Sequence, residues 1–91
     1  MLQDKLKAFD MIVAELRSIL EKKNNDYGDD NIGALGERGL FVRIWDKVSR
    51  LKQLVWANKE AQVKDESIDD TLMDLANYSI INLILRKGQW K

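Results

Sequence analysis

Apolar residues recur at helical spacing in three segments of the chain. The first segment predicts a helix from about Leu2 to Lys23, because its apolar positions alternate at intervals of four and three residues. The second predicts a helix from about Leu40 to Asn58, and the third a helix from about Asp65 to Arg86 with Gly88 as its C-terminal cap. The three apolar stripes are Leu2, Leu6, Phe9, Val13, Leu16 and Leu20; Phe41, Ile44, Val48, Leu51 and Val55; and Ile68, Leu72, Leu75, Ala76, Ser79 and Leu83.

A long glycine-rich loop, residues 24–39, separates the first two predicted helices. It holds four of the five glycines, and the chain has no proline. Loops of this length in compact domains tend to be functional or disordered. The pattern indicates one all-α domain of three helices over residues 1–91.

The C-terminal half of the third helix is apolar almost all round. Ile80, Ile81, Leu83, Ile84 and Leu85 point in every direction, and such a helix must be buried on every side. Three helices cannot easily surround it, so we expect a bundle completed in a homodimer or tetramer. The alternative is that the first helix of the same chain covers it.

The composition excludes several kinds of catalytic and metal-binding site. The 91 residues carry fifteen acids and fifteen bases, with no histidine and no cysteine. Imidazole zinc sites, Ser-His-Asp catalysis and thiolate nucleophiles are therefore excluded, and a metal ion would need oxygen ligands, as Mg²⁺, Mn²⁺ and Ca²⁺ do. No apolar run approaches the ~20 residues of a membrane span, no net charge favours nucleic acid, and the lack of cysteine fits the cytoplasm.

An acidic row follows one face of the third helix. Glu66, Asp70, Asp74 and Asn77 lie within roughly 80° of each other at about 100° per residue. Carboxylates on one face suit a divalent cation, which predicts Glu66 and Asp70 as metal ligands. The alternative is a capping box in which Ser67 caps the helix and Asp70 is its third residue, although this leaves Asp74 and Asn77 unexplained.

A basic row lies on the second helix. Arg43, Lys47 and Arg50 share a face with Asp46 beside them, and guanidinium and ammonium groups bind phosphate oxygens. Facing the acidic row, they would either hold a magnesium-bound phosphate or form salt bridges with the acids. In the loop region, Lys22, Asn25 and Tyr27 are candidate contacts for a base or sugar, unless Tyr27 is a buried anchor of a turn.

The segments "KKNNDYG", "ERGLFVRIWDKVSRLKQL" and "DESIDDTLMDLANYSII" resemble the family called nucleotide modification associated domain 1, which is frequent in phages. The third-helix motif is also similar to the MazG-like all-α nucleoside triphosphate pyrophosphatases. That resemblance implies Mg²⁺ held between a Glu-x-x-Glu helix and a Glu-x-x-Asp helix, with hydrolysis between the α and β phosphates in dimers or tetramers. Glu66-x-x-Asp69 fits the second motif, whereas Asp46, among bases, stands where the first would be.

We therefore expect Mg²⁺-dependent hydrolysis of a (deoxy)nucleoside triphosphate, with Mn²⁺ as a substitute metal. The alternatives are a non-catalytic module that binds or sequesters a nucleotide, and a structural helical oligomer. The expected catalytic residues are Glu66, Asp70 and Lys47; the metal ligands are Glu66, Asp70, Asp74 and Asp46; the substrate contacts are Lys22, Asn25, Tyr27, Arg43, Lys47, Arg50 and Asn77.

Overall fold

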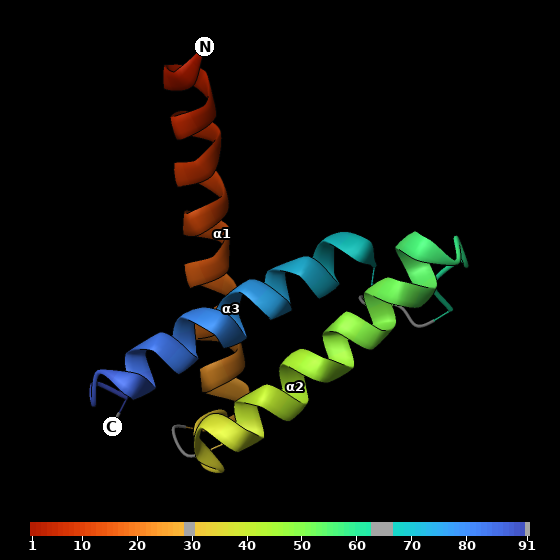
Figure 1. Ribbon diagram of the computed structural model, residues 1–91. Helices are drawn as coiled ribbons and strands as arrows, with labels where there is room; N and C mark the ends of the chain where they lie inside the picture. The colour runs from red at the N-terminus through yellow and green to blue at the C-terminus, as the bar shows by residue number, and fades with distance from the viewer. Residues whose placement is uncertain (29–30, 63–66, 91) are drawn as a thin grey trace.

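The computed structural model describes residues 1–28, 31–62 and 67–90, and these residues form helices and no strand (Figure 1). The helices are α1 (Leu2–Tyr27), α2 (Gly36–Leu51) and α3 (Ile68–Arg86), and a π-helical turn, η1 (Lys52–Trp56), extends α2. The predicted all-α class with three main helices is confirmed. No helix in these ranges is long and apolar enough to cross a membrane.

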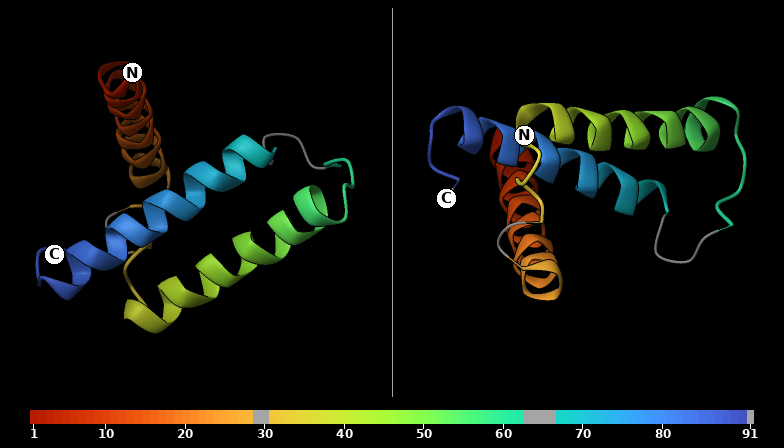
Figure 2. Two further views of the ribbon diagram at one scale, coloured as in Figure 1. Left: turned by 45° about the horizontal axis from the view of Figure 1, so that its top comes forward. Right: turned by 90° about the horizontal axis from the view of Figure 1, so that it is seen from below.

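The helices α2 and α3 lie side by side and run in opposite directions, whereas α1 crosses α3 and its N-terminal half projects away from the pair (Figures 1 and 2). The buried cluster comprises Ile32, Leu40 and Ile81, with Trp90 among the side chains packed on it. This cluster draws on the loop, the start of α2 and the C-terminal half of α3. It leaves the projecting half of α1 outside the core.

Both ends of α3 are set by local signals. Ser67 Oγ accepts a hydrogen bond from the Asp70 amide at 3.1 Å, and Asp70 Oδ2 accepts one from the Ser67 amide at 3.2 Å, which completes the predicted capping box. At the other end, Gly88 has a φ of 70°, and the Gln89 amide donates to the Ile84 carbonyl at 3.0 Å. This is the Schellman arrangement that a glycine cap permits.

The loop between α1 and α2 is shorter than predicted, because both helices extend into the range 24–39. No proline interrupts α1, which continues to Tyr27 and ends at Gly28, with a φ of 84°. At the other end, α2 begins at Gly36, where Glu37 pairs with Arg86 at 2.9 Å. Tertiary contacts at that end outweigh the poor helix propensity of the glycines.

The remaining helix ends also differ from the prediction. The α-helical part of α2 ends at Leu51 rather than Asn58, and η1 follows it. Helix α3 begins at Ile68 rather than near Asp65, because Ser67 is extended and serves as its N-cap. The predicted first turn, with Asp65 and Glu66, lies outside the described residues.

The predicted orientation of α3 is reversed in the structure. Leu72 and Leu83, from the expected core stripe, are 47% and 59% exposed, whereas Thr71, Asn77 and Ile81 are buried. The buried polar groups are satisfied: Thr71 Oγ1 donates to the Ser67 carbonyl at 2.7 Å, and Asn77 Nδ2 to the Leu16 carbonyl at 3.0 Å. Asp74 and Asn77, the later members of the polar row, therefore face the other two helices.

Candidate functional site

Asp74 lies where side chains from all three helices meet. Its Oδ1 is 2.5 Å from Lys23 Nζ at the end of α1, and its Oδ2 is 3.1 Å from Lys47 Nζ on α2. The side chains of Asp74 and Lys47 are only 15% and 18% exposed, and that of Lys23 is 37% exposed. One carboxylate thus holds two ammonium groups in a partly dry environment.

The next turn along the α2–α3 pair carries a third cation, Arg43. Because the two helices are antiparallel, Arg43 on α2 faces Tyr78 on α3, and its guanidinium lies 5.7 Å from the centre of the ring. Arg43 also donates to the backbone oxygen and the side-chain oxygen of Asn31, both at 3.4 Å. These contacts are long, so Arg43 is placed near the loop without being tightly bound there.

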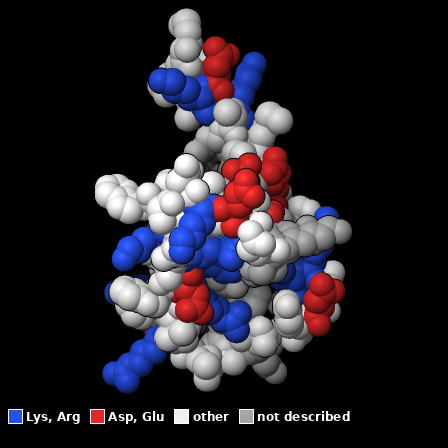
Figure 3. Space-filling model, turned by 90° about the vertical axis from the view of Figure 1, so that its right-hand side faces the viewer, with Lys and Arg blue, Asp and Glu red and all other residues white. Residues whose placement is uncertain are grey.

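Positive charge exceeds negative charge among these side chains. Among the described residues, Lys23, Lys47 and Arg43 contribute three cations against two carboxylates: Asp74, which contacts both lysines, and Asp70, which interacts electrostatically with Lys23. Figure 3 shows one side of the molecule on which basic atoms gather directly below a cluster of acidic atoms, under the projecting end of α1. A half-buried group with a surplus of cations is complementary to an anion, and phosphate oxygens accept from both lysine and arginine.

The residues of the predicted acidic row have different structural roles. Asp70 takes part in the capping box, and its hydrogen bonds with Ser67 hold the pKa of its carboxyl below the ordinary value of 3.8. Asn77 is buried and fastens α3 to the backbone of α1. Glu66 lies outside the described residues, so among them Asp74 is the member of the row that meets the basic row directly.

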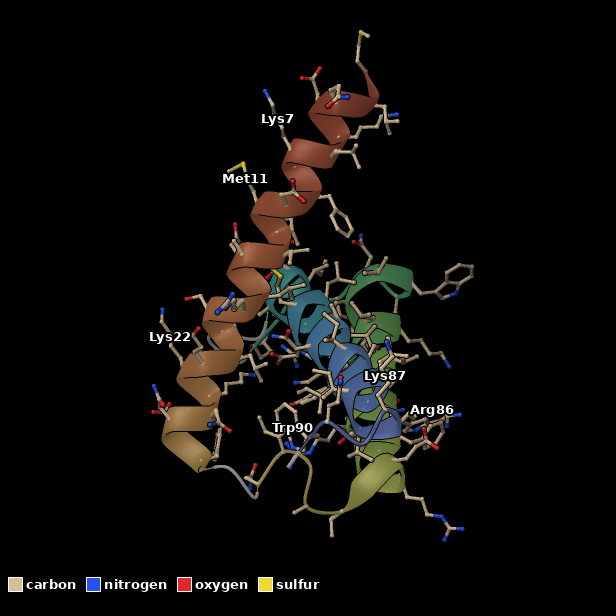
Figure 4. All side chains as sticks on the ribbon, turned by 90° about the vertical axis from the view of Figure 1, so that its left-hand side faces the viewer. Lys7, Met11, Lys22, Arg86, Lys87 and Trp90 are labelled. Atoms are coloured by element: carbon tan, nitrogen blue, oxygen red, sulfur yellow. The ribbon has the colours of Figure 1, made fainter. Side chains whose placement is uncertain are left out.

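Most of the other predicted contacts are exposed. Asp46 is exposed on α2, and Asn25 and Tyr27 are exposed at the end of α1. Lys22 is exposed and points away from the α2–α3 pair (Figure 4). Arg50 is half-buried on α2, one turn beyond Lys47.

The described residues do not by themselves make a good magnesium site. No three carboxylates among them come close enough together to share an ion. Both oxygens of Asp74 already face ammonium groups, and Oδ2 of Asp70 accepts from Ser67. A hard cation competes poorly for carboxylates that are paired in this way.

Sequence reasoning missed Lys23 as a member of the site. The predicted first helix ended at Lys23, where the helix dipole favours cations and so explained the residue without a site. Its contact with Asp74 spans 51 positions of the chain, and neither helix pattern contains a signal for it. Asn31 is a polar residue of the glycine-rich loop, but no pattern in the sequence indicated its contact with Arg43.

Comparison with protein families identifies this region of the chain. A family model described as nucleotide modification associated domain 1 matches residues 23–85. The match covers more than half of the chain, so the protein belongs to this family. It begins at Lys23 and includes Arg43, Lys47, Asp74 and Tyr78, whereas most of α1 precedes it. No curated protein and no solved structure matches the chain.

Proposed function

We propose that the protein binds a nucleotide through its phosphates, with Lys23, Lys47 and Arg43 as the phosphate contacts. One observation carries this proposal: two half-buried lysines from different helices converge on one carboxylate, with a loosely held arginine one turn away. The phosphates of a nucleotide would take over donors that Asp74 holds in the free protein. The family description, which associates the domain with nucleotide modification, supports the same class of ligand.

The surroundings of these cations suit the rest of a nucleotide. Tyr27, at the end of α1, presents an exposed ring on which a base can stack. Asn25 lies on the same last turn, but at about 100° per residue it projects from the side of α1 opposite Tyr27, so it does not contribute to this base end. The site would therefore combine a phosphate end at Asp74 with a base end near residue 27.

Thermal unfolding with a panel of nucleoside mono-, di- and triphosphates, with and without Mg²⁺, tests this proposal. A ligand at about a hundred times its Kd stabilises the folded state by about 2.7 kcal/mol. We expect triphosphates to raise Tm most, and Lys23→Met or Lys47→Met to remove most of this shift. Lys87→Met is the matched control, since Lys87 is exposed beyond the end of α3 (Figure 4). If no nucleotide raises Tm, the proposal is wrong.

Mg²⁺-dependent hydrolysis of the bound triphosphate is the second candidate function. It is favoured by the position of Asp70, an exposed carboxylate one turn before Asp74 on the same helix, and by the resemblance to MazG-like pyrophosphatases. The metal would be held by Glu66 and Asp70, with Asp74 or Asp46 assisting. If no pyrophosphate is released, the protein is a binding module and not this enzyme. If release persists unchanged in Asp70→Asn, Asp70 is not a ligand of the metal.

The proposal extends to the assembly, the origin and the location of the protein. A MazG-like arrangement would have the helices completed by further copies of the chain. A phage or prophage origin and a cytoplasmic location would fit a protein that acts on the nucleotide pool.

A further inference from the structure

The single chain exposes more surface than a folded monomer of its size. Its accessible area is 7410 Å² for a mass of 10.6 kDa, whereas the usual scaling gives about 5,500 Å². Its radius of gyration is 14.4 Å, against about 12 Å for a compact chain of this length. The excess, roughly 1,900 Å² per chain, is in the range that obligate homodimers bury.

The projecting half of α1 is one source of this excess. Residues 2–14 are all exposed, and they carry the first four residues of the apolar stripe: Leu2, Leu6, Phe9 and Val13. A segment of about this length gains little stability as a helix without packing. Figures 1 and 4 show it standing clear of the other helices.

A groove of complementary character lies in the angle between α1 and α3. Its floor is apolar, and acids stand along its rim: the lining consists of Ile12, Leu16, Ile19, Leu72, Met73 and Ala76, with Glu15, Asp69 and Asp70. Helical spacing of about 100° per residue places Lys5 on the side of α1 that also carries Ile12 and Ile19. The projecting half thus carries an apolar stripe and, beside it, Lys5. The groove carries the complementary groups, an apolar lining and acidic side chains.

We propose that two copies of this chain associate through α1, the projecting half of each filling the α1–α3 groove of the other. The two α1 helices then run antiparallel about a two-fold axis, so every contact occurs twice. In this arrangement Leu6 lies opposite Leu16 of the second copy, and Lys5 lies beside Glu15 of the second copy. Leu72, an exposed residue of α3, is covered as well, because it lines the groove. The α1 side of this interface precedes residue 23, and the association is tested without nucleotide, so its failure and the failure of the nucleotide proposal are distinguishable.

Sedimentation equilibrium of the full chain measures the association. We expect a dimer at micromolar concentration, and a rise of at least a hundredfold in the dissociation constant for Leu6→Ser with Phe9→Ser. The matched control is Met11→Ser, because Met11 is as exposed as Phe9 (68% and 65%) but points outward with Lys7 and Lys22 (Figure 4). Both substituted sites are solvent-exposed in one chain, so circular dichroism should show that the variant still folds.

Charge reversal tests the proposed pairing of Lys5 with Glu15 of the second copy. Lys5→Glu should weaken the dimer, and Glu15→Lys in the same chain should restore it in part, whereas Lys7→Glu should have no effect. A monomeric wild type at 100-fold higher concentration, or a dimer that Leu6→Ser with Phe9→Ser leaves intact, would overturn the proposal. The latter result would assign self-association to another surface, such as the exposed face of α2.

Cysteine cross-linking tests the direction of the pairing, because the chain has no cysteine of its own. A mixture of Lys5→Cys and Glu15→Cys chains should form a disulfide between the two different chains, and neither variant should do so alone. Efficient cross-linking of Lys5→Cys with itself would show a parallel pair and would contradict the antiparallel arrangement.

Discussion

At the scale of single residues, Asp74 is bound to two lysines at once, and its replacement tests whether it holds these lysines for a phosphate or contacts the ligand itself. Asp74→Asn leaves two partly buried ammonium groups without a counter-charge, so we expect a loss of about 1–3 kcal/mol of stability in the absence of ligand. If phosphate takes over the lysines, the variant should be stabilised by triphosphate more than the wild type is. Urea unfolding with and without nucleotide measures both effects. A variant that unfolds like the wild type but no longer responds to nucleotide would assign Asp74 to ligand contact instead.

The indole ring of Trp90 packs so close to Gly33 that a larger residue does not fit there. A Cβ at residue 33 would overlap the indole nitrogen, and Trp90 packs against the buried cluster of Ile32, Leu40 and Ile81. We expect Gly33→Ala to cost about 1–3 kcal/mol through overpacking and to change the tryptophan fluorescence. In the background of Trp90→Ala, the same substitution should have little further effect. Additive effects of the two changes would show that the ring does not occupy this place.

At the scale of elements, α3 shows which features a sequence can predict. Its cap at Ser67 and its end at Gly88 depend on residues within a few positions, and both were predicted correctly. Its orientation depends on what packs against it. Leu72 looked like a core residue because apolar spacing was the only signal, whereas Thr71 and Asn77 are buried because their side chains find backbone carbonyls.

The candidate site was predicted in part for the same reason. The basic row on α2 and the acidic row on α3 were both visible in the sequence, and they predicted that Lys47 lies opposite Asp74. The two side chains form a salt bridge, which was one of the two alternatives for these rows. Lys23 and Asn31 join through the path of α1 and the loop, which no local pattern encodes. The helical residues 24–27 were missed because Asn and Asp favour turns in general, although nothing in this stretch stops a helix that has already started.

The capping box of α3 should be visible in the pH dependence of stability. The pKa of Asp70 is lowered in the folded protein from 3.8, so its stabilising contribution is present above this value and is lost as the pH falls below it. Ser67→Ala removes the hydroxyl hydrogen bond, the larger of the two from Ser67 that lower the pKa, and leaves the one from the backbone amide. Loss of the N-cap side chain should cost about 1 kcal/mol at pH 7. Chemical unfolding between pH 7 and pH 2 measures this: the difference between wild type and variant should shrink below pH 3.8. A difference that stays constant with pH would contradict this origin.

At the scale of the whole molecule, we expect the small buried core to make stability depend on association. Few apolar side chains are buried within one chain: they are Leu16, Ile32, Leu40, Leu54 and Ile81 among the described residues. If the dimer through α1 supplies the remaining burial, Tm should rise with protein concentration, because a partner that binds only the folded state stabilises it by mass action. Calorimetry over a hundredfold range of concentration measures this. A constant Tm at every concentration would mean that the isolated chain is stable enough alone.

The continuity of α1 has a consequence for how the two ends of the molecule communicate. One uninterrupted helix carries the proposed dimer contacts at its start and Lys23 near its end, and Asn77 holds it to α3 at Leu16 between them. The helix α1 can therefore tilt as a rigid body about its contact with Asn77 at Leu16, so that its two ends move together. Movement of the projecting arm in the dimer would shift Lys23 relative to Asp74, so pairing of two chains would change the affinity for phosphate. By thermodynamic reciprocity, bound phosphate would change the pairing by the same factor.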